Sequence, residues 1–345
     1  MEQNKNVMNE EVVVDYTDDQ RTEITNKAND QYLKMAKEGK YKDILVKFGQ
    51  NGNYSLNNLL YMLSQNPNAT VAKGMGEWER AGRSIKKGAK SMEIMAPTKE
   101  EYEVAAKDEA GNDMYDEDGV QIMNKRERTI GFHPNYVFDV KDTEGEKYES
   151  YKIGEKISDS EKSIILDGVR RALRTKRYRM VFTNGADFAD GENFKVDVEK
   201  RTLKVKKNMK NAETSLAAIE GASKAMCAYK NRNFEGLKGK KAEIFEDASI
   251  KCILAARYGL DTSGMEFGYM QKLGESDLLT LRENLSSVCT GTKIVMDRVT
   301  SAFARAEREK AQNAMPTGIS ALNDLFDKED FQDKSARKDD MEVVA

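Results

Sequence analysis

The chain has 345 residues, of which 39% are hydrophobic and 33% charged, and its formal net charge is −3. This length accommodates two domains of roughly 100–200 residues each. No run of about 18 apolar residues occurs, which excludes a membrane-spanning helix and a membrane partner. The acidic N-terminus has no apolar segment of the kind that forms a secretory signal, so we expect a cytoplasmic protein.

The small net charge hides a segregation of charge along the chain. Residues 20–97 contain 13 Lys and Arg against 7 Asp and Glu, whereas residues 1–19 contain 1 against 6. Residues 98–150 contain 7 basic residues against 15 acidic ones. A basic block between acidic segments is typical of a local nucleic-acid footprint, although a solvated charged surface gives the same pattern.

Apolar periodicity predicts three helices near the start of the chain, after a disordered acidic tail over 1–18. The first covers 19–38, with Ile24, Ala28, Tyr32 and Met35 at helical spacing. The second covers 41–48, and the third begins at Ser55 and stops at Asn66-Pro67. A short helical turn then carries Trp78, and a strand over 91–95 is expected to end at Pro97.

The next segment predicts a long hairpin followed by a domain boundary. Residues 101–107 and 129–140 have strand character, and the acidic stretch 108–119 between them is expected to be a mobile loop. The polar stretch 142–157 is the predicted linker, so the first domain covers 19–141.

The second half predicts a mostly helical domain over 158–310 with a small sheet. Ser158 and Glu161 form a capping box for a helix over 158–176. Strands are expected over 178–183, 194–198 and 202–206, and helices over 214–229, 241–258 and 276–310. Residues 311–345 are expected to be largely disordered, apart from an amphipathic piece over 319–326. Cys227, Cys252 and Cys289 are far apart, which favours buried thiols over a disulfide framework. The predicted fold class is α+β.

Four cations within eight residues, Arg83, Lys86, Lys87 and Lys90, are the first candidate for nucleic-acid binding. Clustered Lys and Arg neutralise phosphates and release counterions, which gives salt-sensitive affinity without sequence preference. Unstacked bases of a single strand also stack on aromatic rings. Tyr54, Tyr61, Trp78 and Tyr136 are available, but a core role is equally open for Trp78 and is favoured for Tyr61. Asn57, Asn58 and Gln65 offer amides to bases or phosphates, or else satisfy their own backbone.

The order of these residues closely resembles the N-terminal domain of the ArdC-type antirestriction proteins, which also occurs in LtrC-like and TraC-like primases. The resemblance covers about 19–140 and rests on the following segments: Tyr54-Ser55-Leu56-Asn57-Asn58, Gln65-Asn66-Pro67-Asn68-Ala69, Trp78, Gly82 to Lys90, Ile94-Met95-Ala96-Pro97 and Phe138-Asp139-Val140. It implies single-stranded DNA binding, with Tyr54, Ser55, Asn57, Asn58, Gln65, Trp78, Arg83, Lys86, Lys87 and Lys90 as the expected DNA-binding residues. The acidic insert at 108–119 is longer than the family pattern.

In ArdC-type proteins the second domain is similar to zinc metallopeptidases with an HExxH helix. Here the corresponding stretch reads Ile219-Glu220-Gly221-Ala222-Ser223, and the chain's single histidine is His133. Glu220 and Glu246 match the catalytic and downstream acids, so the resemblance implies a vestigial site without metal or catalytic residues. The alternative interpretation is that Glu220 and Glu246 are ordinary surface carboxylates on charged helices.

We therefore expect a non-enzymatic, cofactor-free protein of a mobile element that binds single-stranded DNA and protects incoming DNA. No nucleotide-binding loop is present. Two further basic clusters, at 170–179 and 200–210, extend the DNA track or serve local structure. The alternatives are a scaffold that binds a protein partner through its C-terminal domain, and a residual metallopeptidase.

Overall fold

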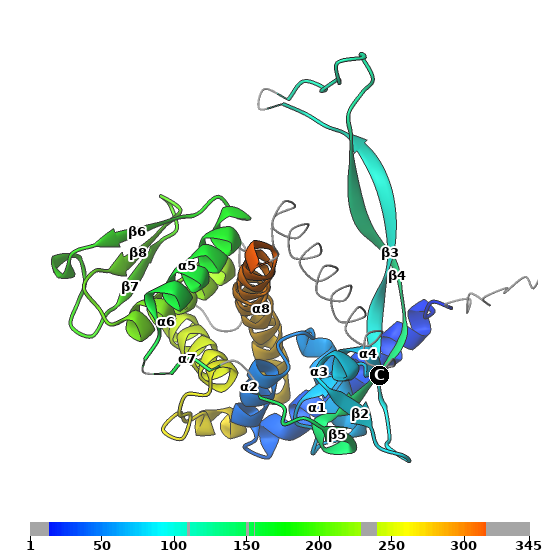
Figure 1. The fold of residues 1–345 in the computed structure, drawn as a ribbon. Coiled ribbons are helices and arrows are strands. Elements are labelled where there is room, and N and C mark those ends of the chain that lie inside the picture. The colour runs from blue at the N-terminus through cyan, green and yellow to red at the C-terminus, as the bar shows by residue number, and fades with distance from the viewer. Residues whose placement is uncertain (1–13, 109–110, 150–151, 155, 229–239, 315–345) are drawn as a thin grey trace, which may run out of the picture.

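The structure is a computed structural model that describes residues 14–108, 111–149, 152–154, 156–228 and 240–314. Helices and small sheets alternate along the chain, so the fold class is α+β as predicted (Figure 1). Within the described residues, none of the helices combines the length and apolar character needed to cross a bilayer.

The predicted N-terminal helices are confirmed as α1 (Asp18–Lys37), α2 (Tyr41–Gln50) and α3 (Leu56–Gln65). Thr17 and Gln20 form a capping box at the start of α1, and Ser55 caps α3 by accepting from the amide of Asn58. These caps satisfy amide groups that have no partner within the helix. The apolar positions that predicted α1 all face the core.

The N-terminal sheet has the strand order β1-β4-β3 and is dominated by one long hairpin. Its strands are β1 (Ala72–Lys73), β3 (Met92–Ala105) and β4 (Met123–Asp139). The short helix α4 (Met75–Arg80) precedes a two-stranded ladder between β2 (Arg83–Ile85) and β5 (Thr143–Gly145). A 3-10 turn, η1 (Val140–Asp142), joins β4 to β5.

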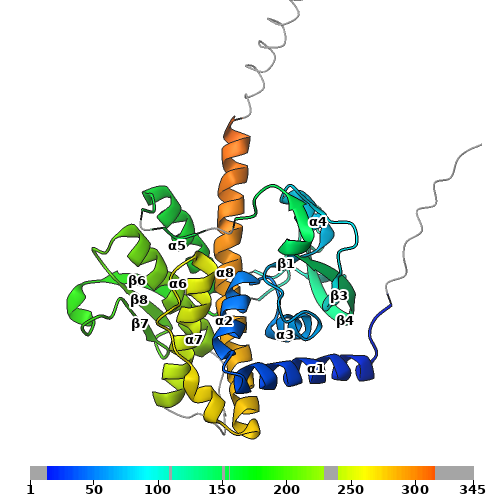
Figure 2. The same cartoon turned by 90° about the horizontal axis from the view of Figure 1, so that it is seen from below.

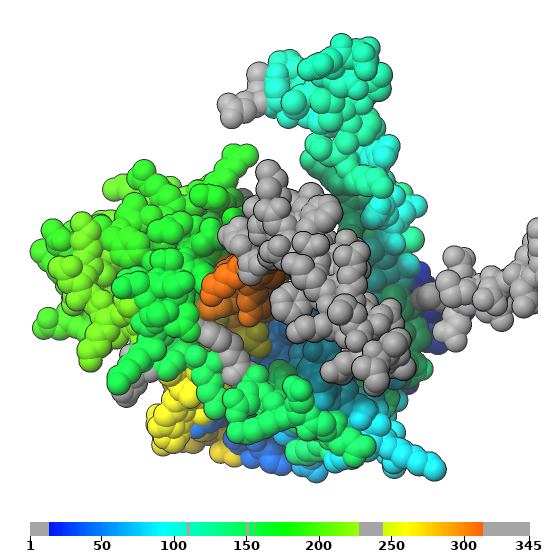
Figure 3. Space-filling model, viewed as in Figure 1, coloured from blue at the N-terminus to red at the C-terminus, as the bar shows by residue number. Residues whose placement is uncertain are grey.

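Pro97 does not end its strand, contrary to the prediction. The backbone groups of Glu93 and Met95 bond to side chains of α3 rather than to β4. Pro97 follows Glu93 and Met95 at an interval of two residues, so its nitrogen points to the same edge of β3, away from β4. The missing N–H of proline therefore removes no hydrogen bond of the ladder. The hairpin therefore continues as an arm that stands away from the body (Figures 1 and 3).

The tip of this arm, where a mobile loop was predicted at 108–119, contains isolated bridges and turns among its described residues. Isolated bridges join Lys107 to Asp113 and Tyr115 to Gln121, and the amide of Met114 bonds to the carbonyl of Ala106. At the base of the arm, Asp15 and Tyr16 dock against the hairpin, although a disordered tail was expected there. The Tyr16 amide bonds to the Phe132 carbonyl at 2.6 Å, and residues 1–13 lie outside the described part of the chain.

The C-terminal half follows the predicted order of elements. The capping box at Ser158 and Glu161 is confirmed at the start of α5. The elements are α5 (Asp159–Arg174), β6 (Arg179–Thr183), η2 (Gly185–Asp187), β7 (Phe194–Asp197), β8 (Thr202–Lys206), α6 (Asn211–Ala228), α7 (Lys240–Tyr258), η3 (Gly268–Lys272) and α8 (Glu275–Ala314). In the sheet β6-β8-β7, β6 runs parallel to β8, and β7 runs antiparallel to it.

The two halves of the chain share buried surface through close helix contacts. A Cβ added at Gly49 of α2 would lie 2.3 Å from the carbonyl oxygen of Ile253 in α7. Arg282 of α8 also donates to Asn57 of α3 at 2.8 Å. Within the C-terminal half, a Cβ at Gly168 of α5 would lie 2.7 Å from the Cα of Val299 in α8. Only glycine permits backbones to approach this closely, and Figure 2 shows α2 beside the C-terminal helices.

Two predicted boundaries shift. The stretch 142–157, expected to be a linker, contains β5, and α8 continues to Ala314 instead of ending at 310. The predicted amphipathic piece at 319–326 lies outside the described residues. The expectation of buried thiols is confirmed, because all three cysteines are free and buried.

Candidate nucleic-acid interface

The basic segment after α4 is partly strand rather than loop. Residues 83–85 pair with β5, and only residues 86–91 form the loop that reaches β3. Lys86, Lys87 and Lys90 are exposed there. The Lys86 Nζ donates to the Lys141 carbonyl at 2.7 Å. No ion pair within the described part of the chain neutralises any of these three lysines.

Arg83, also predicted to contact DNA, holds the ladder together. Its Nε donates to the Thr143 hydroxyl at 2.7 Å, and its Nη2 donates to the Thr143 carbonyl at 2.9 Å. Its Nη1 bonds to the Glu146 carbonyl. A guanidinium with these three partners fixes the ladder that carries the lysine loop, so Arg83 positions the loop.

A group of ammonium ions gathers beside the loop. Lys47 donates to the Ala69 carbonyl, and Lys141 donates to the Asn68 carbonyl at 3.0 Å. Burial is the main cause that lowers the pKa of Lys47, and the neighbouring Lys141 acts in the same direction. The predicted set lacked Lys47 and Lys141. Lys141 lies in an acidic stretch of sequence and reaches the loop only through the pairing of β2 with β5.

Acidic residues also approach the ladder. Glu144 lies opposite Ser84 in the register of β2 and β5, and the Glu146 side chain lies beside Gly82. The pairing therefore brings part of the acidic segment 98–150 next to the basic segment 20–97. The local field is weaker than the charge count of residues 20–97 alone predicts.

Trp78 is fully buried, and this settles the alternatives left open for it. Its Nε1–H donates to the Phe138 carbonyl at 2.9 Å. Its ring meets Tyr148 edge-on, with 5.3 Å between centroids. A base cannot reach this ring without unpacking the domain, so the stacking role is wrong in this conformation and the core role holds.

The other aromatic candidates differ in exposure. Tyr54 is buried, and its hydroxyl donates to the Ala72 carbonyl at 3.1 Å, which excludes it from stacking. Tyr61 is buried as expected, and its hydroxyl donates to Glu93 at 3.1 Å. Tyr136 on β4 is 51% exposed and remains available to a ligand.

The amide side chains of Asn58 and Gln65 on α3 form hydrogen bonds with the backbone at the edge of β3. Asn58 donates to the Met95 carbonyl at 2.8 Å and accepts from the Met95 amide at 3.0 Å. Gln65 forms the same pair with Glu93, with both distances at 2.8 Å. Asn57 accepts from Arg282 of α8 at 2.8 Å. With Ser55 acting as the cap of α3, all four predicted polar contacts have partners within the protein.

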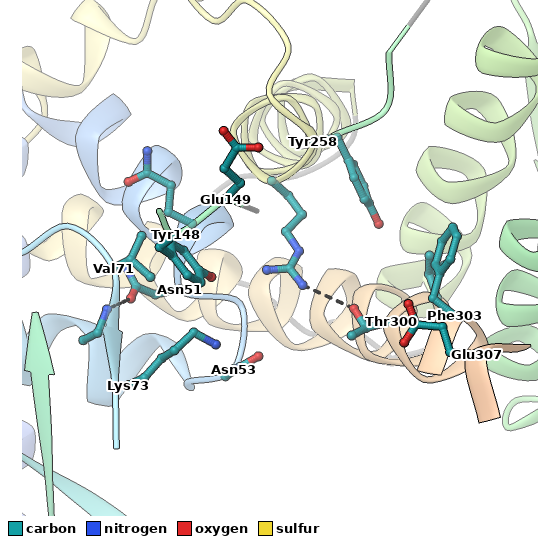
Figure 4. Close-up of a pocket in the computed structure, with 14 residues that line it drawn as sticks. Asn51, Asn53, Val71, Lys73, Tyr148, Glu149, Tyr258, Thr300, Phe303 and Glu307 are labelled. Carbon is teal, nitrogen blue, oxygen red and sulfur yellow. Dashed lines mark hydrogen bonds between the residues drawn. The ribbon is translucent and has the colours of Figure 1, made fainter. Parts of the chain in front are cut away.

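A cavity of about 350 Å³ lies between β1, α7 and α8, close to the ladder (Figure 4). Its lining includes two cations, Lys73 and Arg257, and three aromatic rings, Tyr148, Tyr258 and Phe303. The Lys73 Nζ lies 5.5 Å from the Tyr148 ring centroid, and Arg257 bonds to Thr300 at 3.2 Å. Glu149 and Glu307 also line the cavity, so its charge is mixed. Sequence reasoning missed this site because its walls come from segments that are far apart along the chain.

The stretch 219–223, which the sequence analysis compared with HExxH, lies in α6, and its first and last residues serve packing. Ile219 is fully buried, and the Ser223 hydroxyl donates to the Ile219 carbonyl at 2.9 Å. Glu246 on α7 is buried. His133, on β4, lies 2.9 Å from the Thr98 hydroxyl through its Nδ1. Within the described residues, no cluster of three His, Cys, Asp or Glu side chains is arranged to hold a metal.

Glu220 faces a second cavity, of about 360 Å³, that contains paired charges. The Lys251 Nζ lies 3.6 Å from Glu220, and the Lys224 Nζ lies 2.9 Å from Asp247. Burial is the largest influence on Glu220 and raises the pKa of its carboxyl, whereas Lys251 acts in the opposite direction. Two ammonium groups beside the carboxylates disfavour a bound divalent cation.

Comparison with solved structures finds two crystal structures of the antirestriction ArdC protein from the R388 plasmid, one metal-free and one Mn(II)-bound. Each is 12% identical to this chain, and the alignments cover 81% of it and 98% or 97% of the ArdC chain. The TM-scores are 0.38 and 0.37. No protein-family model matches the chain, and no curated protein matches it. At this level of similarity, roles for the residues depend on the geometry of this chain alone.

Proposed function

We propose that this protein binds single-stranded DNA without sequence preference through the loop that carries Lys86, Lys87 and Lys90. The observation that carries the proposal is that these lysines have no carboxylate partner within the described residues, on a loop fixed by the Arg83 ladder. Ammonium groups of this kind gain by neutralising phosphates and releasing counterions. Arg83 and Lys141 support the loop from the ladder.

A preference for single strands would come from aromatic side chains that a strand leaving the loop could reach across the ladder of β2 and β5. From β5 the chain continues directly to Tyr148, which lines the cavity of Figure 4 together with Phe303. An unstacked base gains about 1–3 kcal/mol by stacking on an aromatic ring, and a duplex offers no such base. Tyr136 is a second exposed ring. These residues replace Trp78 and Tyr54 as candidates for stacking.

The proposed biological role is protection of incoming single-stranded DNA of a mobile element, without catalysis. This role is supported by the ordered residue pattern over 54–97 that resembles the ArdC-type domain. The packing of Ile219 and Ser223, and the lysines beside Glu220, argue against zinc hydrolysis at the second site. Binding alone suffices for protection, because a covered strand is inaccessible to a nuclease.

The test is fluorescence anisotropy with a labelled single strand of roughly 30 nucleotides at several salt concentrations, with the matching duplex as competitor. The loop variant is Lys87→Glu with Lys90→Glu, because neither side chain holds another described residue in place. The matched control is Lys34→Glu with Lys272→Glu, which reverses two charges elsewhere.

We expect the wild type to bind tightly at low salt and to prefer the single strand. The loop variant should bind more weakly, and the slope of log affinity against log salt should decrease by about 0.7 for each phosphate that is no longer neutralised. The control variant should bind like the wild type. Equal binding by all three proteins, or no binding at low salt, would overturn the proposal.

A second function, binding of a protein partner, is favoured by the tip of the hairpin arm. Tyr115 and Val120 are 58% and 62% exposed there, and Met114, Ile122 and Met123 are also exposed. The arm cannot bury these side chains against its own core, and exposed apolar groups that cluster mark interaction sites. A photo-crosslinking residue at Tyr115 should then give a partner adduct that the same residue at Leu279 does not give.

A further inference from the structure

The sheet β6-β8-β7 has one face against the helices and one face open. Leu203 and Val205 of β8 are fully buried, and a Cβ added at Gly221 of α6 would meet Leu203 and Phe194. Side chains alternate along a strand, so the residues between these positions point the other way. In Figures 1 and 2 the described helices all lie on the inner side of this sheet.

The open face carries four cations, Arg179 of β6, Lys195 of β7, and Lys204 and Lys206 of β8. Asp197 is the single acid among the strand residues that point to this side. Its carboxylate lies 4.0 Å from the Lys200 Nζ, in the turn after β7. In the described part of the chain, no ion pair engages the three strand lysines, and the Arg179 Nε donates to the Thr202 hydroxyl at 3.1 Å.

Two of these lysines oppose each other directly, since Lys195 is the register partner of Lys204. Like charges at directly opposite positions destabilise a sheet. Neither lysine is needed for packing, because no described helix covers this face, and a neutral residue at either position would avoid the repulsion. An anion that lies across both strands would remove the repulsion.

The turns that flank this face are strained. Arg177 precedes β6 with φ of 58°, Arg201 precedes β8 with φ of 44°, and Asn208 follows β8 with φ of 60°. The left-handed region is unfavourable for arginine, whereas asparagine adopts it more readily. Both arginines lie next to Arg179 of the open face, since Arg177 precedes it by two residues and the Arg201 carbonyl accepts from its amide. Strain of this kind is concentrated at functional sites.

We propose that the open face of β6-β8-β7 binds the phosphate backbone of a single DNA strand, as a second contact surface besides the lysine loop. Lys204 and Lys206 are separated by about 6.6 Å along β8 and form a row of point charges. Among the residues of the three strands that point outward there is no aromatic ring, so the contact is to phosphates and carries no sequence information. The inference rests on the proposed function for the identity of the ligand.

The decisive variant is Lys195→Glu, because stability and affinity should then change in opposite directions. The substitution replaces the repulsion with Lys204 by an attraction, so the urea midpoint of unfolding should increase. Affinity for the labelled single strand should decrease, and the salt slope should decrease by about 0.7 or more. A variant that merely damaged the fold would lower both quantities.

The loop variant Lys87→Glu with Lys90→Glu, measured in parallel, separates this proposal from the proposed function. Weaker binding by Lys195→Glu and by the loop variant supports both surfaces. If Lys195→Glu binds like the wild type while the loop variant is weakened, the open face is not a DNA contact. If the loop variant binds like the wild type while Lys195→Glu is weakened, the loop proposal fails and the open face stands.

Discussion

Replacement of Trp78 gives the sharpest test of how the N-terminal half is built. The indole is fully buried, donates to the Phe138 carbonyl at 2.9 Å and packs edge-on against Tyr148. Truncation of a buried aromatic side chain to alanine costs about 3–5 kcal/mol. Trp78→Phe keeps most of the packing and leaves the Phe138 carbonyl without its partner, which costs about 1–3 kcal/mol.

The assay pairs urea unfolding with DNA binding on the same samples. Trp78→Ala should lower the free energy of unfolding by at least about 3 kcal/mol. Trp78→Phe should be less destabilised and, where it is fully folded, should bind the single strand like the wild type. If Trp78 stacked on a base, its loss would instead cost about 1–3 kcal/mol of binding, a factor of roughly 5 to 150. Trp78→Ala with wild-type stability and weakened binding would refute the core role. Tyr136→Ala removes an aromatic ring that is exposed and is therefore the matched comparison. It should keep the wild-type stability and, if Tyr136 stacks on a base, should bind the single strand more weakly.

Three further predictions follow from the contact between α2 and α7 and from buried groups of the C-terminal half. Gly49→Ala places a Cβ 2.3 Å from the Ile253 carbonyl oxygen and should cost about 1–3 kcal/mol in urea unfolding, whereas Gly154→Ala, with no atom within 4 Å, should be neutral; equal stabilities would contradict the α2–α7 contact. Because burial raises the folded-state pKa of Glu220, its ionised form costs stability above that pKa, and the cost disappears below the unfolded value of about 4.3. Glu220→Gln should therefore raise the melting temperature relative to wild type at pH 8 and give no gain at pH 4, and a pH-independent difference would count against the raised pKa. Burial raises the pKa of Cys252 to about 11, and the three thiols are buried, so they should react with a disulfide reagent at pH 8 only after unfolding; fast reaction of the native protein would show that they are accessible.

Most helices could be predicted from the sequence because their signals are local. The capping boxes at Thr17 and Ser158, and the spacing of Ile24, Ala28, Tyr32 and Met35, depend on residues within one helix. The strands that the sequence analysis missed or ended too early depend on residues that are distant along the chain. Residues 83–85 become strand only because residues 143–145 pair with them. Pro97 continues its strand because its nitrogen points away from the partner strand β4, so no ladder bond is lost.

The candidate site was predictable only in part, for a related reason. The density of Lys86, Lys87 and Lys90 identifies an exposed basic loop, and the structure places all three at the surface. The sequence alone could not reveal that Lys141 lies beside these lysines, or that Glu144 and Glu146 reduce the positive electrostatic field there. These neighbours are fixed by the register of β2 and β5, which is a tertiary property.

The residue pattern that resembles the ArdC-type domain is explained first by the architecture. Asn58 and Gln65 hold the backbone of Met95 and Glu93, Ser55 caps α3, and Trp78 anchors β4 through Phe138. An edge strand must be covered or it pairs with other chains, and the α3 amides provide that cover. Such a pattern is required whether or not DNA binds, so it predicts the fold more strongly than the ligand. The case for DNA therefore depends on charges that serve no packing or pairing among the described residues, namely those of Lys87, Lys90, Lys195 and Lys204, because no requirement of folding accounts for them.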